Sequence, residues 1–442
     1  MPRSSIFTLT KWQGHREEIN FSYDCERFGT FTETLTLPVA LPDQPSSDLA
    51  RLIDLLHAAL GVSYYKAAAA QEISLPGFVD APKAQAMIKA LYTQGLAEFF
   101  IRANLDYPPR TEFIFAENTH QDFSKPVISA NEKALIAFGG GKDSYVADAI
   151  CARSGLTTEL ASVILSDKVG NVLQGFSTKP LLLARRHLDP KIRKIADQGA
   201  YNGHVPITAI NVLILALIAG LRGDRYVVFA NERSADEPTL QYGNLTANHQ
   251  YSKSSAFEKL LSDAIKEAGT TNPHFFSVLR PFSEIWIAQS LSHLPEALAK
   301  FSSCNRNFHI DGRRTTRWCG ACAKCAFTAL MLAPFLPPAA MTKIFPGNFL
   351  DDESLLPLFR DLLGLSDIKP WDCVGTMGEC RAALWQLSQG TDWRETLIVK
   401  RLLPDVLTRQ DTSALAREWQ TALAPAANKT LPEKFMEAAS CL

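Results

Sequence analysis

Short apolar segments alternate with helical segments in the middle of the chain. The apolar runs of strand length cover residues 134–138, 160–165, 226–230 and 275–279. Between them, residues 143–153 and 207–221 have helical length, and the second of these segments is apolar on all sides. Strands that alternate with helices are typical of a parallel sheet covered on both faces. The pattern predicts an α/β domain with the helix at 207–221 buried against its sheet.

The two ends of the chain have different patterns. A strand-like stretch at 31–37 comes before helical segments at 48–60 and 82–102, and a polar stretch containing prolines follows at 107–131. After about residue 335 the chain is helical and interrupted by prolines. We therefore predict three parts: an N-terminal accessory α+β domain over 1–130, a central domain over 131–334, and a C-terminal helical region over 335–442.

Composition and charge exclude several classes of protein. The 442 residues include 45 Lys+Arg and 46 Asp+Glu, a formal net charge of −1, so the chain lacks the basic excess that holds proteins on nucleic acid. The longest apolar run, at 207–221, is shorter than the roughly 20 residues that span a bilayer. The first 20 residues lack the apolar segment of a secretory signal. We therefore expect a cytoplasmic protein without a membrane or nucleic-acid partner.

A glycine-rich turn joins the first central strand to the next helix. Residues 134–144 read ALIAFGGGKDS, and glycines at such a turn let backbone N–H groups and a helix N-terminus approach an anion. Two common phosphate-binding loops are excluded, because the P-loop needs a glycine at Ile136 and the dinucleotide fingerprint needs one at Ser144. The candidates to bind a nucleotide phosphate are Gly139, Gly140, Gly141, Lys142, Asp143 and Ser144.

Four of the nine cysteines fall within 22 residues. They are Cys304, Cys319, Cys322 and Cys325. In a reducing compartment, clustered cysteines indicate a metal site rather than disulfides. Four thiolates complete a tetrahedral zinc site and leave no position for a reacting water, so such a zinc ion is structural. An iron–sulfur cluster and four unmetallated thiols are the alternatives.

Polar side chains follow the strand at 226–230. In an open parallel sheet, ligands bind at the carboxyl ends of strands, so this loop should share a crevice with the glycine turn. Glu232 and Asp236 are candidates to hold Mg²⁺ through oxygen. The alternative is a solvated charged loop.

Two further segments carry groups that can move protons. Residues 248–254 read NHQYSKS, in which His249 and Lys253 could hold an acid and transfer a proton. In the C-terminal region, Cys373 and Cys380 are either a reactive pair or buried thiols at the start of a helix.

The glycine turn resembles the S-G-G-x-D-S signature of the PP-loop ATP pyrophosphatases. That resemblance implies an adenine-nucleotide α-hydrolase-like fold and cleavage of ATP to AMP and pyrophosphate. This sequence departs from the signature at Gly139, where serine is usual, so one hydroxyl contact to pyrophosphate is missing. The CGACAKC element at 319–325 is similar to the zinc-binding element of the 7-cyano-7-deazaguanine synthases, which belong to the same superfamily.

Several motifs, taken in their order along the chain, resemble those of one family within this superfamily. The glycine turn, the segments 203–211, 231–235 and 248–254, the cysteine element and residues 369–374 together resemble the family of UDP-N-acetylmuramoyl-L-alanyl-L-glutamate epimerases. The resemblance implies that ATP and Mg²⁺ are used to invert the terminal L-glutamate of the UDP-muramoyl dipeptide through an acyl-adenylate. AMP and diphosphate are then released in a step of peptidoglycan synthesis.

The sequence leaves several alternatives open within that resemblance. The candidate bases for Cα proton removal are His249, Lys253, Glu232 and the pair Cys373 and Cys380. A PP-loop ligase or amidotransferase that forms an amide, a nitrile or a thiolated base is the alternative enzyme class. A scaffold that binds nucleotide or zinc without catalysis is the third reading. The oligomeric state is not predicted.

One basic stretch stands out on this neutral chain. It contains Arg185, Arg186 and His187, followed by basic residues at 191, 193 and 194. We interpret the stretch as a solvated helix face or as a contact for the UDP phosphates.

Overall fold

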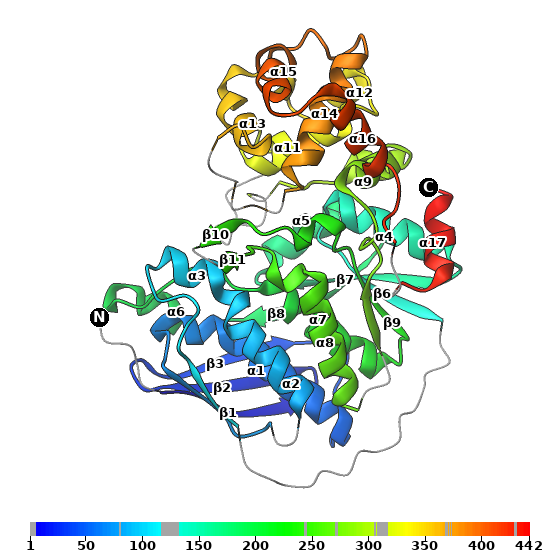
Figure 1. Ribbon diagram of the computed structural model, residues 1–442. Helices are drawn as coiled ribbons and strands as arrows, with labels where there is room; N and C mark the ends of the chain where they lie inside the picture. Colours follow the sequence, from blue (N-terminus) through cyan, green and yellow to red (C-terminus); the bar gives the residue numbers. More distant parts are fainter. Residues whose placement is uncertain are drawn as a thin grey trace.

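One ten-stranded sheet organises the computed structural model (Figure 1). The structure describes residues 6–78, 81–115, 132–242, 245–269, 273–304, 306, 317–366, 370, 372, 374–427 and 431–442. The strand order is β12-β9-β6-β7-β8-β3-β2-β1-β4-β5. The strands are β1 (Ile6–His15), β2 (Glu18–Cys25), β3 (Gly29–Thr36), β4 (Glu72–Leu75), β5 (Glu112–Phe115), β6 (Lys133–Ala137), β7 (Thr157–Ile164), β8 (Leu181–His187), β9 (Tyr226–Phe229) and β12 (His274–Ser277).

Five neighbouring strands, β12, β9, β6, β7 and β8, are parallel. Their order places β6 in the middle, so the glycine turn that follows β6 emerges at the centre of the sheet. The four strands predicted from apolar runs are confirmed as β6, β7, β9 and β12. The coarse prediction of a mostly parallel sheet flanked by helices is therefore confirmed for this part of the chain.

The interpretation of residues 185–187 as a helix face is wrong, because they form the end of β8. Arg186 is 3% exposed and is paired with the buried Glu33 of β3. Only residues 191–194 of the basic stretch are helical, as α6 (Lys191–Lys194).

The N-terminal strands extend the same sheet. β3 pairs antiparallel with β8, and β1, β2 and β3 form an antiparallel meander. On its other edge, β1 pairs in parallel with β4, which pairs in parallel with β5. The sheet thus runs from the N-terminal part into the central part, and the boundaries at residues 130 and 334 stay predictions.

Helices cover both faces of the sheet. On one face lie α1 (Ser47–Ala68), α2 (Pro82–Tyr92), α7 (Ile207–Arg222) and α8 (Ser255–Glu267), and on the other lies α4 (Lys142–Arg153) with α9 (Glu284–Ser292) and α17 (Glu433–Ser440). Alternate residues of β6 divide between the two cores, since Leu135 joins the first and Ile136 the second. The buried helix predicted at 207–221 is confirmed as α7.

The single helix predicted over 82–102 is wrong. It ends at Tyr92, and α3 (Ala97–Arg102) begins only after a short 3₁₀ turn at Gln94–Leu96. The Thr93 hydroxyl donates to the carbonyl oxygen of Lys89 at 2.7 Å, and side chains of this kind compete with helical hydrogen bonds.

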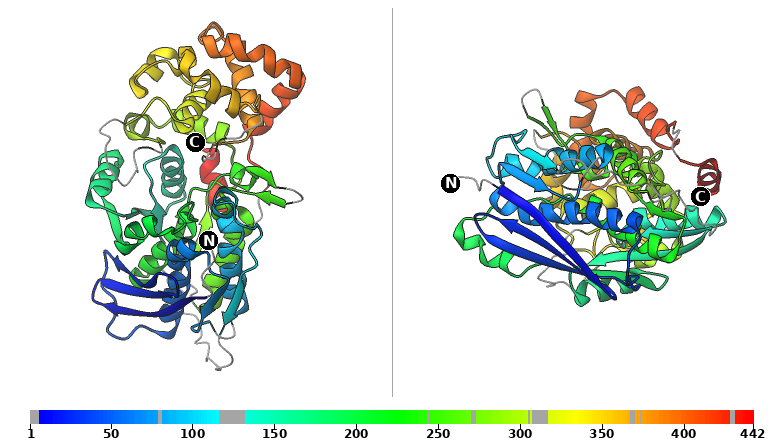
Figure 2. Two further views of the ribbon diagram at one scale, coloured as in Figure 1. Left: turned by 90° about the vertical axis from the view of Figure 1, so that its left-hand side faces the viewer. Right: turned by 90° about the horizontal axis from the view of Figure 1, so that it is seen from below.

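The C-terminal part is helical, as predicted. Its helices between residues 335 and 422 lie at the end of the molecule opposite β1, β2 and β3 (Figures 1 and 2), whereas α17 packs against α4. The remaining helices are α5 (Asp167–Phe176), α10 (Pro295–Lys300), α11 (Ala323–Leu332), α12 (Pro338–Ile344), α13 (Leu356–Leu362), α14 (Met377–Gln389), α15 (Leu397–Arg409) and α16 (Thr412–Ala422). No described helix is both long enough and apolar enough to cross a membrane.

Candidate functional site

The glycine turn lies between β6 and the first turn of α4. Gly140 has φ +71°, and a Cβ atom there would come within 3.0 Å of the Phe176 ring. Both the backbone conformation and the space therefore require glycine at this position. At Gly139, by contrast, a Cβ atom would meet nothing within 4 Å.

A cavity of about 490 Å³ opens beside this turn, a volume typical of small-molecule sites. It lies where β6, β7 and β9 end, as expected for a ligand site on a parallel sheet. The predicted residues that line it are Gly139, Gly141, Asp143, Ser144 and Lys253. Arg186, which the sequence offered as a possible contact for the UDP phosphates, also lines it. Sequence reasoning did not name the other polar lining residues as site residues, which are Ser162, Ser166, Thr208, Asn211, Asn231, Ser302, Ser303 and Lys324.

The loop after β9 reaches this cavity through Asn231, whose amide donates to Ser277 Oγ at 2.9 Å. Glu232 is 5% exposed and accepts a hydrogen bond from Ser234. Asp236 is exposed and accepts the backbone N–H of Ser255 at 2.6 Å. The two candidate Mg²⁺ ligands therefore have different surroundings. The Asp236 carboxylate binds the backbone at the start of α8, whereas the Glu232 side chain is buried in the protein.

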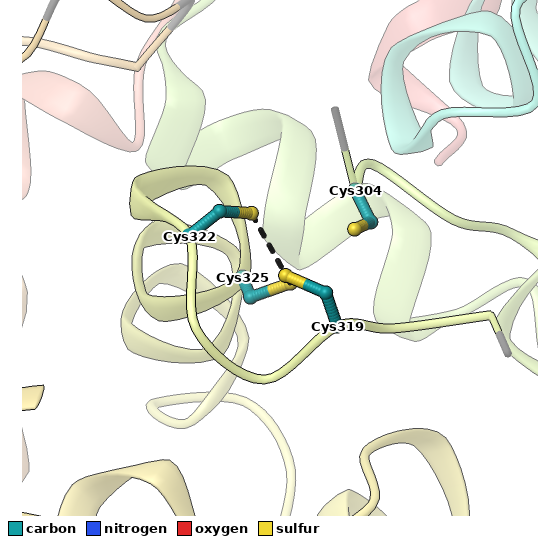
Figure 3. Close-up of side chains that lie close together, drawn as sticks. All are labelled: Cys304, Cys319, Cys322 and Cys325. Carbon is teal, nitrogen blue, oxygen red and sulfur yellow. Dashed lines mark hydrogen bonds between the residues drawn. The ribbon is translucent and has the colours of Figure 1, made fainter. Parts of the chain in front are cut away.

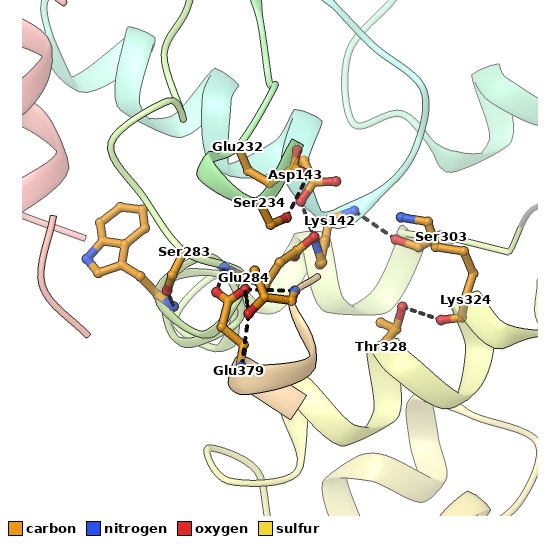
Figure 4. A network of polar contacts seen from close by, with 12 residues as sticks. Lys142, Asp143, Glu232, Ser234, Ser283, Glu284, Ser303, Lys324, Thr328 and Glu379 are labelled. Carbon is orange, nitrogen blue, oxygen red and sulfur yellow. Dashed lines mark hydrogen bonds and ion pairs between the residues drawn. The ribbon is translucent and has the colours of Figure 1, made fainter. Parts of the chain in front are cut away.

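Lys142 does not line the cavity. Its side chain is fully buried, and its ammonium forms ion pairs with Asp143 and Glu284 (Figure 4). Burial alone would lower the pKa of Lys142, but these two carboxylates raise it. The Lys142 ammonium thus stays charged and fixes the first turn of α4 against α9.

A second carboxylate extends this buried network into the C-terminal helices. Glu379 accepts the backbone N–H of Glu284 at 2.8 Å and closes a capping box with Thr376 at the start of α14. Burial raises the pKa of Glu284 and that of Glu379. Cys380 is buried beside Glu379 and does not line the cavity. Cys373 lies outside the described residues.

Lys253 is the predicted cation that faces the cavity. Its Nζ donates to Gln250 Oε1 at 3.3 Å. Its charge acts on both Asp143 and His204, which places Lys253 between the glycine turn and a group of histidines. The backbone oxygen of Lys253 accepts from Arg280 at 2.6 Å, and Arg280 also donates to Glu232 O. Arg280 therefore ties the loop after β9 to the segment that carries Lys253.

His249 contacts the carboxylate of Glu98 through Nδ1, and His204 approaches the same oxygen at 3.3 Å. Sequence reasoning missed Glu98 and His204. His204 falls in a segment that carried the family resemblance, but Glu98 had no signal, since its partner His249 is 151 residues away.

The four clustered cysteines converge (Figure 3): Cys304 follows α10, Cys319 and Cys322 lie in the segment that leads into α11, and Cys325 lies in the first turn of α11. Their sulfur atoms lie within 4.8 Å of one another, with Cys319 and Cys325 at 3.8 Å and Cys322 and Cys325 at 3.5 Å. Four sulfurs at about 2.3 Å from one zinc ion are about 3.8 Å apart. The donor set and spacing therefore fit a tetrahedral zinc ion. Hydrogen bonds from Cys322 and Cys325 also lower the pKa of the Cys304 thiol.

Two family models and three named proteins match this chain. Residues 3–278 match the MurL N-terminal domain and residues 300–417 match the MurL C-terminal domain. The chain is similar to three proteins named UDP-N-acetyl-alpha-D-muramoyl-L-alanyl-L-glutamate epimerase. It is 36% identical to that of Xanthomonas oryzae pv. oryzae, covering 86% of this chain and 84% of the relative. It is 40% identical to that of Salinispora tropica (85% and 82%) and 39% identical to that of a Micromonospora species (85% and 84%).

Proposed function

Because the chain belongs to the MurL family, we propose that it inverts the terminal L-glutamate of UDP-N-acetylmuramoyl-L-alanyl-L-glutamate to D-glutamate. The reaction consumes ATP, proceeds through an acyl-adenylate, and releases AMP and diphosphate. It forms a step of peptidoglycan synthesis. The named relatives support the substrate and the inversion, and the features below support the use of ATP.

The observation that carries the proposal is the cavity at the glycine turn. Gly139, Gly141 and Ser144 line one side of it, and Lys253 lies on another. Backbone N–H groups at the start of α4 can bind phosphate oxygens, and a lysine can hold a carboxylate or a phosphate. The cavity therefore offers a place where an acid and a nucleotide could react with each other.

Activation by ATP solves a chemical difficulty of this epimerisation. Removing the Cα proton beside an ionised carboxylate places negative charge next to negative charge. In an acyl-adenylate that carboxylate is neutralised, and the carbanion is delocalised as an enolate. The Cα proton of the adenylate is therefore much more acidic.

Four chemical steps convert the L-glutamate to the D-glutamate. An oxygen of the glutamate α-carboxylate forms a bond to the α-phosphorus of ATP, and the bond from that phosphorus to diphosphate breaks. The glycine turn holds the departing diphosphate. A base takes the Cα proton, and the enolate is reprotonated on the opposite face. Water then cleaves the adenylate to give the D-glutamate carboxylate and AMP.

Asp143 is the carboxylate suited to hold Mg²⁺ at this site. Asp143 lines the cavity, whereas Glu232 does not line it and its charge acts on the buried Lys142 and Glu284. Oxygen ligands of this kind are what Mg²⁺ prefers. The ion would neutralise negative charge on the phosphates. The four-cysteine site would hold a structural zinc ion apart from the reaction.

Among the candidate bases, position favours His249 and Lys253. Lys253 lines the cavity, and His249 belongs to the neighbouring histidine group. Cys380 is buried in α14 away from the cavity lining, and Glu232 is turned into the buried network.

Exchange of labelled diphosphate into ATP tests the adenylation step. With the purified chain and Mg²⁺, we expect exchange that depends on the UDP-muramoyl dipeptide. If no labelled diphosphate enters ATP in the presence of the dipeptide, the acyl-adenylate proposal is wrong. If AMP and diphosphate form together with consumption of ammonia, an amine or sulfur, the chain is a ligase of the alternative class.

A further inference from the structure

Three side chains from distant parts of the sequence converge beside the cavity. Glu98 lies on α3, His204 precedes α7, and His249 precedes the 3₁₀ turn Tyr251–Lys253; their ligand atoms lie within 4.8 Å of one another. We infer that Glu98, His204 and His249 form one proton-transfer unit. In this unit Glu98 is the positioning residue, and the imidazoles exchange the proton with the substrate. The inference rests on the proposed function and adds Glu98 and His204 to it.

The contact with Glu98 indicates which ring nitrogen of His249 carries hydrogen. His249 Nδ1 forms a hydrogen bond with Glu98 Oε2, and His204 Nδ1 lies 3.3 Å from the same oxygen. An ionised carboxylate only accepts hydrogen bonds, so a neutral His249 imidazole carries its hydrogen on Nδ1. The lone pair of that ring is then on Nε2, the nitrogen directed away from Glu98, and Nε2 is the atom that acts as a base.

Charges around Glu98 keep it ionised. Its second oxygen, Oε1, accepts from Arg102 at 3.0 Å. Burial would raise the pKa of Glu98, but the hydrogen bond and charge of His249, with smaller contributions from His204 and Arg102, lower it. The carboxylate is therefore available to stabilise an imidazolium when a proton arrives.

The unit is built to take up one proton. Burial, and after it the neighbouring His249, lower the pKa of His204 to about 4. The ring centroids of His204 and His249 are 4.8 Å apart, so a proton on one ring disfavours a proton on the other. At neutral pH His204 is therefore neutral, and its ring can accept the proton.

The loops that carry the two histidines are held firmly. Lys66 Nζ donates to Asn202 Oδ1 and to Gly203 O, each at 2.9 Å. A Cβ atom at Gly203 would come within 2.9 Å of Phe99, so glycine allows this loop to lie against α3. The backbone N–H of His249 donates to Thr239 Oγ1 at 3.0 Å.

Residues close in sequence to the two histidines line the cavity. Thr208 and Asn211, on the first turns of α7 just after His204, line it, and so does Lys253, four residues after His249. The side chains of His204 and His249 keep 18% and 16% of their surface exposed, against 7% for Glu98. Neither imidazole lines the cavity itself, but each keeps part of its surface exposed next to a segment that does, whereas the Glu98 carboxylate is covered.

The surrounding charges favour proton transfer over metal binding, although two imidazoles and a carboxylate are metal-ligand types. Lys66 and Lys253 act electrostatically on His204, and Arg102 pairs with Glu98. Three cations around a single carboxylate repel a divalent ion. They attract an acidic substrate and stabilise the negative charge that develops when its Cα proton leaves.

The test compares Glu98→Gln, His204→Gln and His249→Gln with the wild type and with His15→Gln, an exposed histidine on β1. In deuterated water we expect each of the first three changes to slow deuterium incorporation at the glutamate Cα by about 10²- to 10⁴-fold. Release of diphosphate should continue, because adenylation does not need the base. Glu98→Asp should restore part of the exchange, and His15→Gln should leave it unchanged.

A second readout separates positioning from folding. Nitrogen NMR of the imidazoles should show His249 with hydrogen on Nδ1 in the wild type and a changed tautomer in Glu98→Gln. Unchanged exchange or an unchanged tautomer in Glu98→Gln overturns the inference. So does a divalent metal bound at one per chain that His204→Gln removes. If the wild type itself exchanges no Cα deuterium while it turns over ATP, the proposed function fails instead.

Discussion

Arg186 of β8 forms a buried ion pair with Glu33 of β3 at the junction between the parallel strands and the N-terminal meander. Its Nε donates to Glu33 Oε1 at 2.6 Å, and Nη2 donates to Glu33 Oε2 and Ser63 Oγ, each at 3.2 Å. Glu33 is 0% exposed and Arg186 3%. Because Arg186 also lines the cavity, this pair connects the N-terminal strands to the candidate site.

Replacing Arg186 alone should therefore be strongly destabilising. Arg186→Met leaves the Glu33 carboxylate buried without its cationic partner, which costs about 3–5 kcal/mol of unfolding free energy. The double change to methionine at 33 and 186 should recover most of that loss, because it removes both charges. Urea denaturation measures both effects.

Arg185→Met is the matched control for this prediction. Arg185 pairs with Asp167, whose side chain is 82% exposed, so its loss should cost less than about 1 kcal/mol. Equal stability of the two single variants would contradict a structural role for the buried pair.

Two neighbouring glycines of the turn should respond differently to substitution. Gly140→Ala should lower stability by about 1–2 kcal/mol, because a side chain is disfavoured at left-handed φ. Gly139→Ser should fold like the wild type, since its Cβ meets no neighbour. If diphosphate binds at this turn, the new hydroxyl should lower the KM for ATP by about 2- to 10-fold, since one hydrogen bond contributes about 0.5–1.5 kcal/mol. Thermal melting checks the stability of both variants, and steady-state kinetics check the KM of Gly139→Ser for ATP. A raised KM for ATP in Gly139→Ser would count against phosphate binding at this turn.

The four-cysteine site should bind one zinc ion per chain. Cys319→Ser and Cys325→Ser should lose the metal and melt at lower temperature, because metal binding and folding are coupled. Cys441→Ser, an exposed cysteine at the end of the chain, should keep both metal and stability. Elemental analysis of the purified variants measures the number of zinc ions per chain. Iron with visible absorption would replace the zinc assignment by an iron–sulfur cluster.

His57 should make the chain sensitive to acid. Burial lowers its pKa from 6.5 to about 4, and its Nε2 lies 3.0 Å from Ser22 O. The unfolded chain binds a proton on His57 at higher pH than the folded chain, so this stability is present above pH 6.5 and is lost as the pH falls toward 4. Between pH 7 and pH 5 the loss from this residue is about 2 kcal/mol.

Comparison with His57→Gln isolates that contribution, because groups that titrate in both proteins cancel, among them Asp54, whose pKa burial raises to about 6. The unfolding free energy of the wild type minus that of the variant should fall by about 2 kcal/mol from pH 7 to pH 5. A difference independent of pH would show that His57 titrates alike in both states.

The sequence predicted those parts of the fold whose signal is local. The apolar runs predicted β6, β7, β9 and β12, and the three glycines located the turn between β6 and α4. β8 was missed because its leucines run into Arg185 and Arg186, and the residue that allows Arg186 to be buried is Glu33, 153 positions earlier. Long-range pairing of charged residues leaves no periodic trace in the sequence.

The same limit applied to the candidate site. Cysteine spacing was sufficient to predict convergence at 304–325, since the residue type itself is rare. Lys142 was expected at the phosphate, but its partner Glu284 lies on a distant helix and draws the side chain into the interior. Glu98 was missed because a glutamate on a short helix is ordinary until His204 and His249 are brought against it.

The central claim is that this chain activates a glutamate by adenylation and then inverts it. The most direct test incubates the purified chain with ATP, Mg²⁺ and UDP-N-acetylmuramoyl-L-alanyl-L-glutamate in deuterated water, and measures diphosphate, glutamate chirality and deuterium at Cα. We predict AMP and diphosphate together with D-glutamate that carries deuterium at Cα. Diphosphate formed while the glutamate stays L and free of deuterium would contradict the claim.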